Sequence, residues 1–213
     1  MGPQVVDLDG DGKPDLISGG YDGDINFFKG MGGGRFAPKT ILIDAKQFGK
    51  GKIEGYTILQ AASVAAADWD GDGDIDLIVG CIFGEVYYFE NTGTKTNPKF
   101  GKPVPMMAGG KAIGVGQKAG PEVADWDCDG KLDLIVGSES SGVLFFRNIG
   151  TKTAPKLADP ITIVPADDKT IGCRMKPRVV DWNKDGLPDL LVGGAQMADP
   201  KNIHGYVWLY IRQ

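Results

Sequence analysis

Four short acidic segments of one pattern recur along the chain, and their side chains have the spacing of a cation site. They read DLDGDGKPD at residues 7–15, DWDGDGDID at 68–76, DWDCDGKLD at 125–133 and DWNKDGLPD at 181–189. Carboxylates this close together repel one another, and proteins hold the hard cation Ca²⁺ with such clusters of carboxylate and carbonyl oxygens. The segments therefore predict calcium-binding loops, with up to four Ca²⁺ per chain.

The ligands of each loop can be assigned by position, as in an EF-hand, where alternate residues of a tight loop point inward. Positions 1, 3, 5 and 9 offer side-chain oxygens, and position 7, which varies in chemistry, is expected to offer only its backbone carbonyl. The proposed ligands are Asp7, Asp9, Asp11, Lys13 and Asp15 in the first loop, Asp68, Asp70, Asp72, Asp74 and Asp76 in the second, Asp125, Asp127, Asp129, Lys131 and Asp133 in the third, and Asp181, Asn183, Asp185, Leu187 and Asp189 in the fourth.

A structural alternative to calcium is that loops rich in Asp and Gly are simply good turns. Four copies in register favour the metal over this alternative, and all-oxygen ligands favour calcium over zinc, copper or magnesium. Position 6 is glycine in every loop, which predicts a backbone conformation with positive φ there. The fourth loop, with Asn183 and Lys184, carries less negative charge, so we expect it to bind calcium most weakly.

The acidic segments begin at residues 7, 68, 125 and 181, so the chain is built from four copies of a unit of 56 to 61 residues. Each acidic segment leads into a β-type run such as DLIVG, and an aromatic run such as VYYF follows. With a lead-in strand and a fourth short segment, this gives about four strands per unit. Small sheets with two apolar faces stack as the blades of a β-propeller, because only neighbouring blades can cover those faces. We expect an all-β fold with little helix.

The pattern D-x-D-x-D-G-x-x-D, followed by DLIVG and an aromatic strand, resembles the FG-GAP or VCBS-type repeat of integrin α-subunit propellers and many secreted bacterial proteins. The resemblance covers essentially the whole chain. It implies that the acidic loop joins the first and second strands of a blade and binds calcium. It also implies that the propeller presents a surface for ligands, and that such propellers commonly have seven or eight blades.

The number of units leaves two architectures open. The chain, taken as one domain over residues 1–213 with units at about 1–60, 61–120, 121–176 and 177–213, forms either a small four-bladed ring or half of an eight-bladed ring completed by a homodimer. The last unit holds only three predicted strands, and an unpaired edge strand favours association. Trp69, Trp126 and Trp182, each after the first Asp of its loop, are expected to pack between blades.

Composition narrows the class of protein. The formal net charge of −5 reflects the acidic loops, and four Ca²⁺ would change it to +3. Nucleic acid is not an expected partner, because no stripe of basic and aromatic residues is present. The sequence contains no apolar run of 18 residues, so we expect no membrane span. Its three cysteines are not closely spaced and indicate neither a disulfide framework nor a zinc site. Because extracellular calcium is abundant, we expect a secreted protein, extracellular or periplasmic, and no leader is recognisable after Met1.

The connections between units are the least repetitive parts of the chain, and they are rich in lysine. Such a mildly basic rim fits an acidic glycan or an acidic protein surface, although lysines of this kind also serve simply to keep a protein soluble. The candidate ligand-binding residues are Lys50, Tyr56, Lys111, Lys118, Arg174 and His204.

Three classes of function are consistent with the sequence. The favoured one is a non-catalytic, calcium-binding module that binds extracellular glycan or protein ligands, because every repeated feature serves folding and metal binding. The second is a carbohydrate-active enzyme similar to polysaccharide lyases, but the chain lacks G-x-S-x-G, H-E-x-x-H and a phosphate loop, and it has one histidine. No catalytic residue is assigned. The third is a self-assembling propeller fragment without a ligand.

Overall fold

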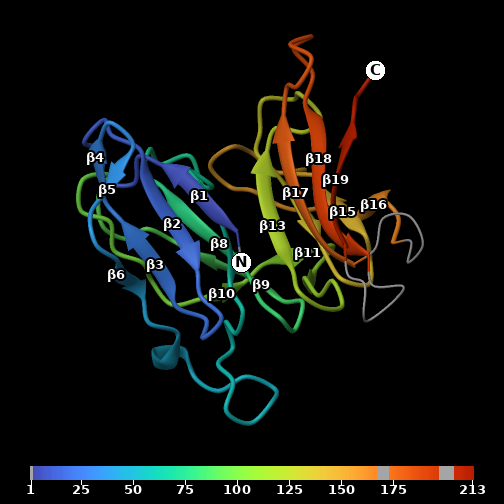
Figure 1. Ribbon diagram of the computed structural model, residues 1–213. Coiled ribbons are helices and arrows are strands. Elements are labelled where there is room, and N and C mark those ends of the chain that lie inside the picture. Colours follow the sequence, from blue (N-terminus) through green and yellow to red (C-terminus); the bar gives the residue numbers. More distant parts are fainter. Residues whose placement is uncertain (1, 167–172, 197–203) are drawn as a thin grey trace.

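The protein folds as a ring of four β-propeller blades, which confirms the expected all-β architecture (Figure 1). The computed structural model describes residues 2–166, 173–196 and 204–213. Each blade is a small antiparallel sheet, and the sheets follow one another in chain order. Within the described ranges there is one short 3₁₀-helix, η1 (Ala45–Phe48), in the connection between the first two blades.

Three blades have four strands and the last has three, as the sequence predicts. Blade 1 contains β1 (Pro3–Val6), β2 (Asp15–Gly19), β3 (Ile25–Phe28) and β6 (Thr40–Ile43); blade 2 contains β7 (Ser63–Ala67), β8 (Asp76–Gly80), β9 (Val86–Phe89) and β10 (Val104–Pro105); blade 3 contains β13 (Gly120–Ala124), β14 (Asp133–Gly137), β15 (Val143–Phe146) and β16 (Ile161–Val164); blade 4 contains β17 (Cys173–Val180), β18 (Asp189–Gln196) and β19 (His204–Tyr210). Two hairpins that the sequence analysis did not anticipate are β4 (Gly30–Gly32) with β5 (Arg35–Phe36), and β11 (Met107–Ala108) with β12 (Lys111–Ala112).

In blades 2 and 3 the second strand is apolar on both faces, because its side chains alternate between two neighbouring blades. In blade 2, Leu77 and Val79 pack with residues of blade 1, whereas Ile78 packs with residues of blade 3. We call the face that meets the preceding blade the leading face, and the face that meets the following blade the trailing face. The DLIVG run is continuously hydrophobic because it serves both.

Three hydrophobic clusters hold the four blades together, one at each junction between consecutive blades. The cluster between blades 1 and 2 includes Ile17 and Ile25 from the trailing face of blade 1, both fully buried against Leu77 and its neighbours. The clusters between blades 2 and 3 and between blades 3 and 4 repeat this arrangement with equivalent residues. Within the described residues, no such cluster joins blade 4 back to blade 1.

In the first three blades, the residue after the first Asp of the loop packs on the following blade. Trp69 and Trp126 do so as expected, and Leu8 fills the same position in blade 1. The expectation is wrong for Trp182, whose side chain is 58% exposed. Trp182 belongs to the trailing face of blade 4, and among the described residues no hydrophobic cluster covers this face.

The acidic loops need two residues in the left-handed backbone region. Glycine at position 6 has the predicted positive φ in all four loops, for example 81° at Gly12. Position 4 has positive φ as well, which the sequence analysis did not foresee. Two loops have glycine there, but the third has Cys128 at φ 61° and the fourth has Lys184 at φ 62°. A side chain in this conformation is strained, because its Cβ approaches the backbone.

Replacing Lys184 by glycine is therefore expected to stabilise the protein. Relief of the strain amounts to about 1 kcal/mol, of which the larger backbone entropy of glycine in the unfolded chain cancels a part. Urea unfolding with a chelator present, so that metal binding does not contribute, measures the effect. Lys39→Gly, at an exposed site without positive φ, is the matched control and should destabilise or change nothing. Equal effects of the two substitutions would contradict the assignment of strain.

Candidate functional site

The four acidic loops lie at one rim of the ring, each joining the first and second strands of its blade. Residues 7–14 connect β1 to β2, and the corresponding segments connect β7 to β8, β13 to β14 and β17 to β18. The residue at position 9 of each loop is also the first residue of the second strand. Loop and sheet therefore share this aspartate.

The aspartate at position 9 is buried and ties the loop to two strands. In blade 1, Asp15 Oδ2 accepts a hydrogen bond from Leu8 N at 2.9 Å, and its Oδ1 accepts one from Gly30 N at 2.6 Å. Gly30 follows the third strand, so one carboxylate holds the loop and both neighbouring strand ends. The same pair of bonds recurs in every blade, made by Asp76, Asp133 and Asp189. Sequence reasoning treated this residue as a ligand and missed its structural role.

The aspartates at positions 1 and 5 shape the loop by accepting backbone N–H groups. Asp7 accepts from Asp11 N at 3.1 Å and from Gly12 N at 2.9 Å. Asp11 in turn accepts from Lys13 N at 2.9 Å. These bonds are side-chain turns of the kind that Asp–Gly segments form without metal. Turn formation and metal binding therefore use the same residues, and the first does not exclude the second.

Three loops bring carboxylates close enough to hold a metal ion. In each, one oxygen from every member of the cluster lies within 4.8 Å of the others. Several carboxylate oxygens in these loops are buried and have no hydrogen-bond partner in the described structure, among them Asp9 Oδ1, Asp68 Oδ1 and Asp127 Oδ1. A buried carboxylate oxygen without a donor is costly unless a cation is bound to it. The clusters are Asp7, Asp9 and Asp15; Asp68, Asp70 and Asp76; and Asp125, Asp127 and Asp133.

Basic side chains neutralise part of the charge in the first and third loops. Lys29 forms ion pairs with Asp9 and Asp11, and its hydrogen bond to Asp11 is the main cause that lowers the pKa of this carboxyl to about 2. In the third loop, Arg147 pairs with Asp127 at 2.5 Å. Lys29 and Arg147 occupy the same place in their units, directly after the third strand. Sequence analysis missed both residues, although their equivalent position was visible in the repeat.

Among the described residues, no basic side chain forms an ion pair with the second loop. The residue equivalent to Lys29 is Glu90, and Asp70 instead accepts a hydrogen bond from the neutral Tyr88 hydroxyl at 3.2 Å. Burial, followed by repulsion from the neighbouring aspartates, raises the pKa of Asp74. Burial likewise raises the pKa of Asp76 to about 6. The second loop is therefore the most electronegative of the four.

The fourth loop has a different donor set. Asn183 replaces the aspartate at position 3, and its Nδ2 donates to Asp185 Oδ2 at 2.8 Å. Hydrogen bonds from Leu187 N and then from Asn183 lower the pKa of Asp185. The Asn183 amide thus donates to an Asp185 oxygen that would otherwise be available to a cation.

Two of the six candidate ligand-binding residues lie together at the opposite rim. Lys50 and Tyr56 line a cavity of about 590 Å³ in the connection between blades 1 and 2. The Tyr56 hydroxyl lies 3.3 Å from that of Tyr21, and its ring centroid lies 6.3 Å from that of Phe83. Tyr21 and Phe83 come from the β2–β3 and β8–β9 turns, so three separate segments build this aromatic hollow. Sequence analysis missed Tyr21 and Phe83, which carry no local signal.

The structure does not gather the other four candidates at this hollow. Lys111 lines a separate cavity of about 170 Å³ beside β15. Lys118 forms an ion pair with Glu139 at 2.7 Å, and His204 is exposed at the start of β19 near Tyr206. The side chain of Arg174 lies outside the described residues.

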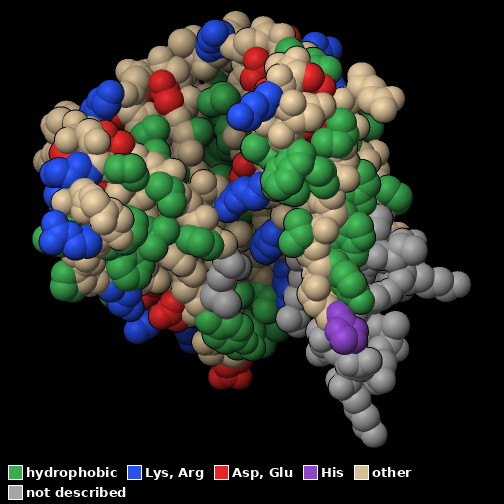
Figure 2. Space-filling view, turned by 45° about the horizontal axis from the view of Figure 1, so that its top comes forward, with side chains coloured by type: hydrophobic (Ala, Val, Ile, Leu, Met, Phe, Trp, Pro, Cys, Tyr) green, Lys and Arg blue, Asp and Glu red, His purple; other side chains and the backbone are tan. Residues whose placement is uncertain are grey.

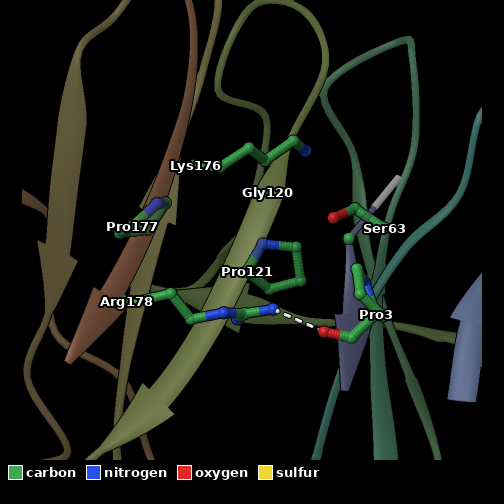
Figure 3. A pocket seen from close by; sticks show the side chains of 8 residues that line it. Pro3, Ser63, Gly120, Pro121, Lys176, Pro177 and Arg178 are labelled. Carbon is green, nitrogen blue, oxygen red and sulfur yellow. Dashed lines mark hydrogen bonds between the residues drawn. The ribbon is translucent and has the colours of Figure 1, made fainter. Parts of the chain in front are cut away.

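The axis of the ring contains a cavity of about 320 Å³ where the first strands of all four blades converge (Figure 3). Arg178 pairs with Glu122 and donates to the Pro3 carbonyl at 3.1 Å, so it crosses from blade 4 to blade 1. Lys176 is largely buried, and its Nζ donates to the Ala119 carbonyl at 3.2 Å. Burial, with a smaller contribution from the charge of Arg178, lowers the pKa of Lys176 to about 8.

Because the pKa of Lys176 is lowered, we expect the free energy of unfolding to depend on pH. Between about pH 8 and 10.5 the folded protein releases the Lys176 proton while the unfolded chain keeps it, so the free energy of unfolding rises with pH. Below pH 8 the buried charge costs up to about 3 kcal/mol, which Lys176→Met removes. Urea unfolding of both proteins from pH 7 to 10.5 should show the variant's advantage shrinking as pH rises. An advantage independent of pH would contradict the buried charge, and Lys111→Met, at an exposed lysine, should show no trend.

No helix in the described part of the chain has the length and apolar character needed to cross a membrane.

A comparison with curated proteins gave no match. Among the solved structures that resemble the fold are two that match nearly all of this chain. One is an Agrocybe aegerita lectin that recognises non-reducing terminal N-acetylglucosamine, 21% identical over 96% of this chain and 50% of that chain, with a TM-score of 0.49. The other is BBS1N in complex with ARL6DN, 14% identical over 98% of this chain and 56% of that one, with a TM-score of 0.44. The chain spans about half the length of these structures.

The pattern of the FG-GAP-like repeat matches the chain in three overlapping copies, at residues 7–79, 68–136 and 125–192. Each copy begins at the first aspartate of one acidic loop and ends within the second strand of the next blade. The matches include all four loops and the sheets between them. The chain therefore belongs to the FG-GAP-like repeat family.

Proposed function

We propose that this protein is a non-catalytic, calcium-stabilised β-propeller that works outside the cytoplasm, secreted or periplasmic, as a scaffold for binding a glycan or protein ligand. The observation that carries the metal part is the set of buried carboxylate oxygens without donors, in Asp9, Asp68 and Asp127. They belong to the three clusters whose oxygens lie within 4.8 Å of one another. Oxygen-only ligands in a flexible loop suit calcium better than magnesium or a transition metal.

The loops are expected to differ in affinity because their surroundings differ in charge. In the first and third loops a bound ion competes with Lys29 and Arg147 for the same carboxylates. The second loop has no competing cation within the described residues, so it should bind calcium most tightly. The fourth loop, with the Asn183 amide in place of a carboxylate, should bind most weakly. Calcium would stabilise the fold by its preference for the folded state.

Calcium titration calorimetry on the metal-free protein tests this order. Asp70→Asn should weaken the tightest site about tenfold, because it removes one charged ligand. The fold tolerates Asn at this position, since the fourth loop carries Asn183 there. A site held at 100 times its dissociation constant stabilises by about 2.7 kcal/mol, so excess EDTA should lower Tm by roughly 5–10 °C for each site that it empties.

Asp159→Asn is the control for this experiment, because it makes the same change of charge at an exposed residue outside the loops. It should leave both the binding heats and Tm unchanged. A protein that gives no heat with calcium, and melts at the same temperature in EDTA, would remove the metal from the proposal.

The ligand surface that we propose is the aromatic hollow around Tyr56. Exposed tyrosine rings next to polar groups offer an apolar face together with hydrogen-bonding hydroxyls, a combination suited to sugar rings and to protein side chains. Lys50 and Glu54 line the same cavity of about 590 Å³. The hollow lies at the rim opposite the acidic loops, so ligand binding and metal binding do not compete for residues.

A glycan array followed by calorimetry tests the hollow, with acidic and neutral oligosaccharides as probes. Tyr56→Ala should weaken binding of any glycan found by at least about tenfold, since it removes the central ring of the hollow. Tyr206→Ala, at an exposed tyrosine of blade 4, is the matched control and should have no effect. Binding that survives Tyr56→Ala would move the ligand site elsewhere.

A further inference from the structure

The trailing face of blade 4 is uncovered, although the same face is buried in every other blade. Val207 in β19 pairs with the glycine that ends the DLLVG run, as Ile25, Val86 and Val143 do in the other blades. Those three side chains are at most 1% exposed, whereas Val207 is 72% exposed. Trp182 shows the same contrast at 58%, against 6% for Trp69. Figure 2 shows hydrophobic side chains on the surface that runs from His204 along the central hollow.

The leading face of blade 1 is the second uncovered face. Leu16 and Phe28 are paired in the sheet and correspond to Leu77 and Phe89, which are fully buried in blade 2. In blade 1 they are only half-buried, and Val5 on the same face is 63% exposed. Each uncovered face thus retains the residues that form one half of an ordinary junction between blades.

The two faces do not close on each other within one chain. Within the described residues, the hydrogen bonds between blades 1 and 4 come from Arg178, and the hydrophobic clusters lie at the other three junctions. Opening this seam would therefore break few contacts. Forming a junction like the other three would bury Val207, Trp182 and Leu191.

We propose that two copies of this chain associate head to tail, with the trailing face of blade 4 in one copy on the leading face of blade 1 in the other. The repeat indicates which surface covers the trailing face of blade 4. In blades 1 to 3, the trailing face is covered by the leading face of the next blade. The unpaired leading face is that of blade 1. Two such contacts close with two-fold symmetry into a ring of eight blades and leave no exposed face.

One feature of blade 1 adapts its leading face to a different junction. Ser18 stands where Val79, Val136 and Val192 stand in the other blades, and its sheet partner is Asn26. The new junction therefore contains a polar pair within an apolar surround. A mixture of polar and apolar residues is typical of interfaces between proteins that also exist separately in solution.

Sedimentation equilibrium of the calcium-loaded full chain, from about 1 to 100 µM, tests the proposal. We expect a dimer mass for the unmodified protein at the upper concentrations. Val207→Asp and Val5→Asp should each give monomers, because a charge on either face prevents both contacts of the ring. Ile149→Asp, at another exposed hydrophobic residue outside both faces, should remain dimeric.

Mixing the two monomeric variants distinguishes head-to-tail pairing from any other kind. Val207→Asp keeps an intact leading face and Val5→Asp keeps an intact trailing face, so the mixture should form a heterodimer through one contact. An unmodified protein that is monomeric throughout would overturn the proposal, as would a Val5→Asp variant that still dimerises or a mixture that stays monomeric. Circular dichroism of each variant confirms folding, and Trp182→Glu replaces Val207→Asp if that variant is unfolded.

Discussion

In the first three blades, repulsion between clustered carboxylates acts on the same aspartate that holds the strand ends together. The aspartate at position 9 is buried at the base of its loop and accepts backbone hydrogen bonds from the loop and from the end of the third strand. In the first three loops, the aspartates at positions 1 and 3 each place an oxygen within 4.8 Å of it. The group that fixes the sheet is therefore also part of the most charged site in the blade. A bound cation would neutralise the loop and stabilise the strand ends by the same contacts, which is why metal binding and folding are expected to be linked.

A second constraint acts between blades, because a sheet that is apolar on both faces needs a neighbour on each side. The chain satisfies this need at three junctions, where an aliphatic trailing face meets an aliphatic leading face. At the seam between blades 1 and 4, the described residues form a hydrogen bond from Arg178 to the Pro3 carbonyl and no hydrophobic cluster. Comparison of the repeated blades therefore identifies the faces that lack a neighbour. The exposure of Val207 is informative because its three equivalents are buried.

Repetition also explains how much of the structure could be predicted from the sequence. Four blades, three strands in the last of them and glycine with positive φ at position 6 all follow from features that recur in register. Contacts that occur once could not be predicted in this way. The hollow around Tyr56 brings together Tyr21 and Phe83 from distant turns, and Lys29 reaches the first loop from beyond the third strand. The exposure of Trp182 was missed because its sequence position is the same as that of Trp69, and only the arrangement of blades separates them.

A crystal structure of the protein grown in calcium, with anomalous differences measured, tests the central claim most directly. The account predicts an anomalous peak in each of the first three loops, between the carboxylates of positions 1 and 3, with oxygens at about 2.3–2.6 Å. The peak in the second loop should be the strongest. Loops filled by water, or closed by Lys29 and Arg147 alone at saturating calcium, would contradict it.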